Sequence, residues 1–156
     1  MPKTRWLDDR EQRAWRGLMA MQEGLSEFID RQLRNHCDLS HADFQVLAHL
    51  SEASGGRLRS LDLGRMLHWE KSRLSQHVSR MEARGLVSRE RCAHDRRGLD
   101  VTITERGKGL IERAAPQHVA DARDAVIDAL SADELTALTV IADKVRSRLA
   151  ERGSGV

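Results

Sequence analysis

The stretch SLDLGRMLHWEKSRLSQHVSRMEARGLV, residues 60–87, decides the fold of this chain. Its apolar residues recur at three- and four-residue spacing on both sides of the dipeptide His68-Trp69. This spacing predicts two short amphipathic helices joined by a tight turn. We expect the first helix over residues 61–67 and the second over about residues 70–84.

A charged hairpin follows the two helices. Residues 86–92 and 99–104 have the composition of strands, and residues 93–98 are expected to connect them as an arginine-tipped turn. Ser60 is predicted to be the N-cap of the first helix, and Gly85 the C-cap of the second. Helix, turn, helix and hairpin in this order predict a winged helix-turn-helix, which makes DNA the expected partner.

Positive charge is concentrated in the same region. Residues 57–97 carry eleven Arg or Lys against five Asp or Glu, although the net charge of the whole chain is only +2. The segments 1–56 and 110–156 each sum to −2. One basic segment between mildly acidic flanks is expected when one face meets phosphate. Most of the basic residues are arginine, which suits phosphate and guanine, although a GC-rich genome would also favour arginine codons.

Long amphipathic helices are predicted on both sides of this region. Residues 9–35 predict one helix, and a second begins near residue 105 and continues past Pro116, which we expect to bend it. Ser131 and Glu134 form the pattern of a capping box that opens a last helix. A small core cannot cover all these apolar faces, so we expect two chains to pack them together as a C2 dimer. A larger monomeric bundle is the alternative.

The predicted fold class is therefore mainly α with a small β-hairpin wing, a winged helix-turn-helix with long helices that form a dimerisation domain. Residues 1–35 and 108–156 are assigned to the helical dimerisation region, and residues 36–107 to the DNA-binding lobe. No apolar run is long enough to cross a membrane, and the N-terminus lacks the apolar segment of a signal peptide. We expect a cytoplasmic protein without a structural disulfide, since Cys37 and Cys92 are the only cysteines.

These elements resemble the MarR (multiple-antibiotic-resistance regulator) family of winged helix-turn-helix regulators. The resemblance covers most of the chain and rests on several short segments that occur in order. These are Asp62-Leu-Gly-Arg-Met-Leu67, Lys71-Ser-Arg-Leu-Ser-Gln76, Met81-Glu-Ala-Arg-Gly-Leu-Val-Ser-Arg89, Asp95-Arg-Arg97 and Ile103-Thr-Glu-Arg-Gly107. The chain departs from the family at Gly64, where alanine is usual, and at Trp69, where a smaller aliphatic residue is usual.

The resemblance implies a homodimer that binds double-stranded DNA at a pseudo-palindromic operator, with the second helix of the motif in the major groove. It also implies that an arginine of the wing enters the adjacent minor groove. Many members release DNA when a small aromatic acid or phenol binds, some sense peroxide through a cysteine, and some sense zinc. On this basis we expect a transcriptional regulator that acts as a repressor.

The candidate DNA contacts lie on the second helix of the motif and in the wing. If Leu74, Val78 and Met81 are buried, the polar side chains of that helix face outward, where they can reach bases and phosphates. The alternative is an ordinary solvated helix face, or a salt-bridged hairpin tip for the wing. By the family match, Asp95 orients an arginine, Arg97 enters the minor groove, and Arg96 meets phosphate. The predicted contacts are Ser72, Arg73, Ser75, Gln76, Ser79, Arg80, Asp95, Arg96 and Arg97.

An enzyme is not expected, because the sequence contains no HExxH, nucleophile elbow, P-loop or Rossmann glycine run, and we predict no cofactor. A zinc sensor would use residues near His36, Cys37, His41 and His118, but Ala122 stands where a second helical ligand is needed. Peroxide sensing would fall to Cys37 or Cys92, and the latter is expected to be a small buried residue. A protein-interaction module is the remaining alternative, and it predicts no salt-dependent DNA binding.

A pocket for a small aromatic acid or phenol is the last candidate site. It would lie where the long helices meet the DNA-binding lobe, with an aromatic wall and a cationic group for the carboxylate. Plain core packing is the alternative for the aromatic residues. The predicted ligand contacts are Trp15, Arg16, Met19, Phe44 and His118.

Overall fold

The computed structural model describes residues 4–93 and 95–153, except for the side chains of Arg96 and Arg97. The chain divides into two compact units, Met1–His118 and Val119–Val156. This boundary does not coincide with the predicted division of the chain at residues 35 and 107. In the described part of the chain, no helix is both long enough and apolar enough to span a membrane.

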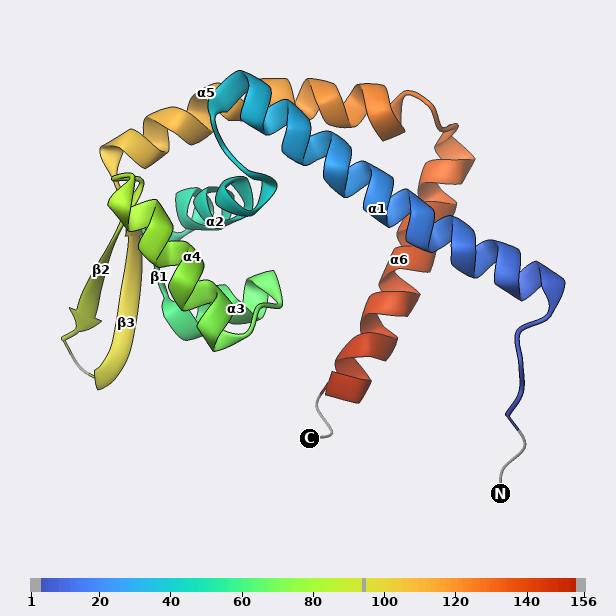
Figure 1. The fold of residues 1–156 in the computed structure, drawn as a ribbon, viewed down its shortest axis with the longest axis horizontal. Coiled ribbons are helices and arrows are strands. Elements are labelled where there is room, and N and C mark those ends of the chain that lie inside the picture. The colour runs from blue at the N-terminus through green and yellow to red at the C-terminus, as the bar shows by residue number, and fades with distance from the viewer. Residues whose placement is uncertain (1–3, 94, 154–156) are drawn as a thin grey trace. The chain divides into compact units, whose positions relative to one another are not determined.

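Two capped helices open the first unit (Figure 1). Helix α1 spans Asp9–Cys37, two residues beyond its predicted end, and stops where Asp38 adopts a left-handed conformation (φ 54°). Helix α2 spans His41–Glu52 and begins with the capping box of Ser40 and Asp43. Each cap satisfies backbone N–H groups that the first turn of a helix leaves without partners.

The helix-turn-helix has the predicted elements, with shifted caps. Helix α3 spans Ser60–Leu67 and helix α4 spans Lys71–Ala83. The expectation that Ser60 caps α3 is wrong, because Ser60 is the first helical residue and the N-cap is Arg59, which makes no side-chain capping bond. Helix α4 likewise ends one residue early, and Gly85 follows its C-cap with φ 71°, a left-handed conformation that glycine adopts without strain.

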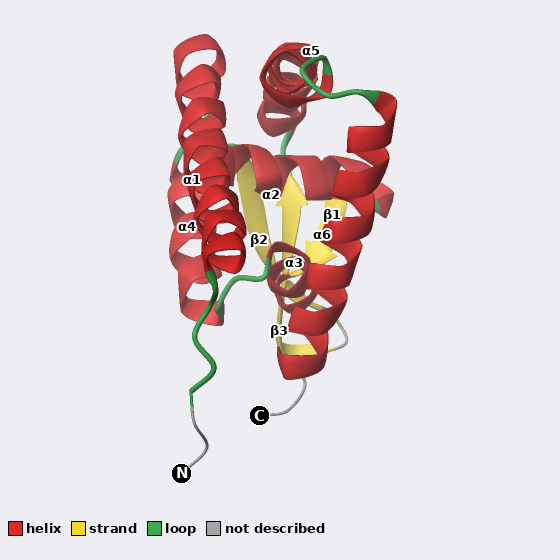
Figure 2. Ribbon diagram, turned by 90° about the vertical axis from the view of Figure 1, so that its right-hand side faces the viewer, coloured by secondary structure: helices red, strands yellow, loops and turns green. Residues whose placement is uncertain are grey.

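Three antiparallel strands complete the lobe. Strands β1 (Arg57–Arg59), β2 (Val87–Cys92) and β3 (Asp95–Ile103) pair in the order β1-β3-β2, with β3 in the middle (Figure 2). The prediction that residues 93–98 form a connecting loop is wrong for residues 95–98. A register shift between Arg91 and Cys92 lets Cys92 pair with Asp95, so β3 begins almost at the tip of the hairpin.

The hydrophobic core of this unit joins α2, α3, α4, the sheet and the first turns of α5. A Cβ at Gly107 would overlap the carbonyl oxygen of Leu86, so α5 approaches the sheet at a distance that only glycine permits. Short 3₁₀ helix η1 (Ser54–Gly56) leads from α2 into β1. The largest fully buried side chains are Leu39, Leu47, Leu50, Leu63, Met81, Leu86, Val46, Val78, Val87 and Val101.

The remaining helices continue from α5, which spans Glu105–Ala122 and passes through Pro116 without ending, as predicted. The π-helical turn η2 (Arg123–Ile127) follows within the second unit. Helix α6 spans Ala132–Gly153, and its predicted capping box is present: Ser131 N–H donates to Glu134, and Glu134 N–H donates to the Ser131 hydroxyl.

Candidate nucleic-acid interface

Helix α4 presents a continuous polar face because its apolar residues are buried. Leu74, Val78 and Met81 are 4%, 1% and 0% exposed, as the sequence predicted. The opposite side carries the predicted residues, which we call the α4 polar face. It consists of Ser72, Arg73, Ser75, Gln76 and Arg80, all exposed, and Ser79, which is half-buried.

The arginines of this face differ in their partners from several other arginines of the lobe. Arg57, Arg59 and Arg65 each lie within 4.0 Å of a carboxylate. By contrast, Arg73 and Arg80 make no ion pair with any carboxylate in the described part of the chain. No carboxylate of the described residues therefore neutralises their charge, which is available to a phosphate or a base edge.

Arg73 is held by an aromatic ring. Its guanidinium carbon lies 4.3 Å from the centroid of the Trp69 ring, a cation–π contact. Trp69 is itself half-buried and packs against the core from the turn between α3 and α4. The bulky residue that the sequence analysis noted as a departure from the family therefore supports an arginine of the α4 polar face.

Arg80 is held by a buried histidine of the same helix. His77 is 9% exposed, and its Nδ1 lies 3.2 Å from Nη2 of Arg80. The other ring nitrogen, Nε2, lies 2.9 Å from Oδ1 of Asp43. The His77 ring also meets Trp69 edge-on, with centroids 5.3 Å apart.

Asp43 connects α4 to α2. Its Oδ2 accepts hydrogen bonds from Ser40 N–H at 3.0 Å and from Arg84 Nη1 at 2.7 Å. Burial alone would raise the pKa of Asp43, but the hydrogen bonds from His77, Ser40 and Arg84 outweigh it and hold the pKa well below its usual range. The contacts of Asp43 with α4 were not predicted, because Arg84 is distant in sequence.

The β2–β3 hairpin follows α4 in the chain, and Arg89 of β2 donates to Glu82 of α4 at 2.8 Å. Figure 1 shows the tip of the β2–β3 hairpin and the N-terminal end of α4 at one end of the lobe. Asp95 lies 3.9 Å from Arg59 of β1, so the predicted orienting carboxylate contacts a basic strand. The predicted side chains of Arg96 and Arg97 lie outside the described part of the structure.

Cys92, the last residue of β2, is buried near the tip of this hairpin. Its Sγ donates a hydrogen bond to Oδ1 of Asp100 at 2.8 Å. That hydrogen bond, together with desolvation and the negative charge of Asp100, raises the pKa of the thiol. The arrangement disfavours the thiolate that peroxide chemistry needs.

The five predicted ligand contacts are only partly brought together. The rings of Phe44 and His118 lie 4.3 Å apart. Trp15 and Arg16 are exposed on α1, and Met19 is half-buried there. Trp15 precedes Asp30, whose carboxylate contacts the start of α2, by about 22 Å of helix at 1.5 Å per residue. Within one chain, α1 therefore separates Trp15 and Arg16 from the Phe44–His118 pair.

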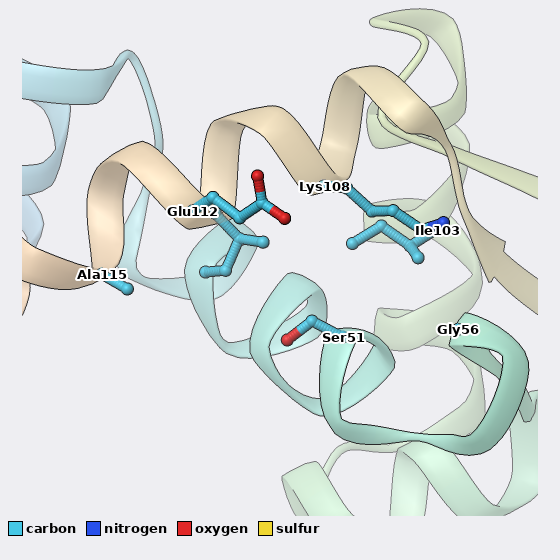
Figure 3. Close-up of a pocket in the computed structure, with 7 residues that line it drawn as sticks. Ser51, Gly56, Ile103, Lys108, Glu112 and Ala115 are labelled. Atoms are coloured by element: carbon cyan, nitrogen blue, oxygen red, sulfur yellow. The ribbon is translucent and has the colours of Figure 1, made fainter.

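A different cleft, of about 260 Å³, lies between the end of α2 and the first turns of α5 (Figure 3). Its floor is apolar, and Lys108 and Glu112 extend from α5 at its edge. The cleft contains none of the five predicted ligand contacts. Its lining residues are Ser51, Gly56, Ile103, Lys108, Ile111, Glu112 and Ala115.

The histidines near Phe44 show no metal-binding arrangement. Burial, followed by the nearby His118, lowers the pKa of His41. Across residues 4–93 and 95–153, no three His, Cys, Asp or Glu side chains gather closely enough to hold a metal ion.

Comparison with known proteins places the chain in a family. Residues 38–98 match the MarR family. The crystal structure of AbsC, a MarR family transcriptional regulator from Streptomyces coelicolor, is 40% identical and has a TM-score of 0.87, covering 98% of this chain and 100% of AbsC. Sco3205, a MarR family transcriptional regulator from the same organism solved in complex with DNA, is 34% identical with a TM-score of 0.91, covering 96% of this chain and 93% of that one.

A curated relative agrees with these structures. The HTH-type transcriptional regulator PecS of Dickeya dadantii (strain 3937) is 28% identical over 129 residues, covering 80% of this chain and 77% of PecS. The fold, the order of its elements and the extent of these matches lead to one conclusion: the chain belongs to the MarR family.

Proposed function

We propose that this protein is a dimeric transcriptional regulator, a repressor, that binds a pseudo-palindromic operator in double-stranded DNA. The observation that carries the proposal is the α4 polar face, where Arg73 and Arg80 lack carboxylate partners among the described residues. A helix with such a face beside a hairpin can enter the major groove while the hairpin meets the neighbouring backbone.

The N-terminal end of α4 adds to this surface. No acidic residue lies in its first turn, and the Glu70 side chain makes no capping hydrogen bond. The first backbone N–H groups of α4 therefore have no side-chain cap, which leaves them open to a phosphate. The DNA complex of Sco3205 supports the same partner for this chain.

Dimerisation is supported by the exposed apolar residues of the long helices. In α1, Trp15 and Met21 are 54% and 52% exposed, and in α6, Ile141 and Leu149 are 55% and 63% exposed. Large apolar side chains at this exposure usually mark a surface that a partner covers. Sedimentation at micromolar concentration should give twice the chain mass of 17.6 kDa. A stable monomer would remove the basis for a palindromic site.

DNA recognition is tested by selecting duplexes from a random pool and titrating the recovered sequence at several salt concentrations. We expect a site with two-fold symmetry, and an affinity that falls steeply with salt because bound phosphates release counterions. Recovery of no preferred sequence, with weak binding that ignores salt, would contradict the proposal and favour a protein-interaction module.

For the effector, we propose a small aromatic acid or phenol that lowers operator affinity. The Phe44–His118 pair supplies a ring and a group that a carboxylate can approach. A tenfold loss of DNA affinity requires about 1.4 kcal/mol of coupling between the two sites. Operator titrations in the presence of aryl carboxylates and phenols test this proposal. Parallel titrations with zinc and with peroxide test whether the regulator responds to a metal or to oxidation instead. If only zinc or only peroxide lowers operator affinity, the proposal of an aromatic effector is wrong and that agent is the effector.

A further inference from the structure

We propose that Trp69 and His77 are positioning residues that hold the two arginines of the α4 polar face ready for DNA without contacting DNA themselves. The inference rests on the proposed function and names the residues that set its specificity. Trp69 acts on Arg73, and His77 acts on Arg80.

The geometry places one support beside each arginine. Arg73 and Arg80 lie two helical turns apart, about 10 Å along the axis and on nearly the same side of α4. Trp69 lies under the guanidinium of Arg73, and His77 accepts from the guanidinium of Arg80. The two supporting rings also contact each other, so they form one connected unit under both arginines.

The hydrogen bond at Arg80 dictates the protonation of His77. A guanidinium can only donate, so Nδ1 of His77, 3.2 Å from Arg80, must be the acceptor and carries no proton. The ring proton then lies on Nε2, which is 2.9 Å from Oδ1 of Asp43. Asp43 therefore fixes the His77 tautomer, and this tautomer lets His77 hold Arg80.

Holding the arginines has a calculable effect on binding. A free arginine has many rotamers, and fixing it at an interface lowers affinity by about two- to tenfold for each side chain. A guanidinium fixed before DNA arrives avoids that loss. An exposed cation–π contact changes an equilibrium by about two- to fivefold, the range expected for Trp69.

Two substitutions separate the contacts of His77. In His77→Gln, the amide nitrogen can take the place of Nε2 and keep the Asp43 contact, but the acceptor for Arg80 is lost. In His77→Asn, the amide oxygen can take the place of Nδ1 and keep the acceptor. We expect the effect of Arg80→Ala on operator affinity to be about two- to tenfold smaller in His77→Gln than in the wild type. In His77→Asn, the effect of Arg80→Ala should stay closer to its wild-type size. The control is His36→Gln, at an exposed histidine, and it should leave the effect of Arg80→Ala unchanged.

An equivalent pair of substitutions tests Trp69. Trp69→Leu removes the ring and Trp69→Phe keeps one, so the effect of Arg73→Ala should shrink about two- to fivefold in the leucine variant and stay closer to wild type in the phenylalanine variant. The Trp6→Leu variant is the control, because Trp6 is 83% exposed. Each pair of substitutions, Arg80 with His77 and Arg73 with Trp69, forms a double-mutant cycle. Additive effects on operator affinity in both cycles would show that Trp69 and His77 only pack the lobe, and would overturn the inference.

Nitrogen-15 NMR of the full-length protein without DNA reads the tautomer directly. We expect a neutral His77 ring with its proton on Nε2, and a proton on Nδ1 would overturn the arrangement even if a His77 variant fails to fold. Failure of the wild type to bind any duplex would overturn the proposed function and this inference with it. Additive cycles in a protein that binds its selected site would overturn this inference alone.

Discussion

Replacing Asp43 with asparagine removes one negative charge from a buried position that faces three donors. Its Oδ2 accepts from Ser40 N–H and Arg84, and its Oδ1 lies 2.9 Å from Nε2 of His77. An amide supplies only one oxygen, so its NH₂ group must face at least one donor. The oxygen is expected to turn toward Ser40 and Arg84, which leaves the NH₂ against Nε2 of His77.

The magnitude follows from these contacts. A hydrogen bond to a charged group contributes about 1.5–3 kcal/mol and a neutral one about 0.5–1.5 kcal/mol. The Arg84 side chain is 38% exposed, so its contact is discounted for solvent screening. Weakening the contacts of Ser40 and His77 and mismatching one donor should lower the free energy of unfolding by about 2–4 kcal/mol. For a chain of this length that corresponds to about 4–16 °C in Tm.

The pH dependence gives an independent check on Asp43. A carboxyl group whose pKa is depressed in the folded state stabilises the fold fully above its unfolded pKa of about 4, and this stabilisation is lost as the pH falls through the folded pKa. The wild type should therefore exceed Asp43→Asn most at pH 7, and the difference should shrink below about pH 4.

Urea unfolding followed by circular dichroism at a fixed protein concentration measures both quantities. Asp38→Asn is the matched control, because Asp38 also faces Arg84, at 3.8 Å, but is fully exposed, so we expect no measurable change. A loss under about 1 kcal/mol for Asp43→Asn at pH 7, or a difference that grows on acidification, would refute the argument.

Further predictions concern glycines and cysteines. Gly107→Ala should lower the free energy of unfolding by about 1–3 kcal/mol because its Cβ overlaps a carbonyl oxygen, whereas Gly24→Ala, with nothing within 4 Å, should raise it by up to about 1 kcal/mol. Equal effects in thermal unfolding would contradict this contrast. Under native conditions iodoacetamide should label Cys37 before Cys92, whose thiol is buried and bonded to Asp100. Mass spectrometry that finds equal labelling rates would count against this account.

Much of the lobe was predictable because apolar spacing and capping chemistry are local. The positions of Leu74, Val78 and Met81 predicted the buried side of α4, and the Ser131–Glu134 pattern predicted the start of α6. Local signals have limits. Ser60 is a good capping residue type, but backbone pairing of the preceding strand places Arg59 at the cap.

The contacts behind the α4 polar face could not be derived as easily. His77 is three residues after Leu74 and four before Met81, so helical spacing alone could have placed it on the buried side. Its partner Asp43 lies on another helix, and only the tertiary fold brings the two together. Residues 95–98 of the hairpin were mispredicted as a loop because polar residues such as Asp95 suit a turn, yet they also pair in an exposed strand.

The most direct test of the central claim measures two dissociation constants for the wild type and for the Arg73→Ala/Arg80→Ala double variant. One duplex is the selected site, and the other is a scrambled duplex of the same composition. We predict that the double variant remains folded, and that it loses affinity for the selected site by at least about tenfold more than for the scrambled duplex. An unchanged ratio of the two dissociation constants would show that the α4 polar face does not read the sequence.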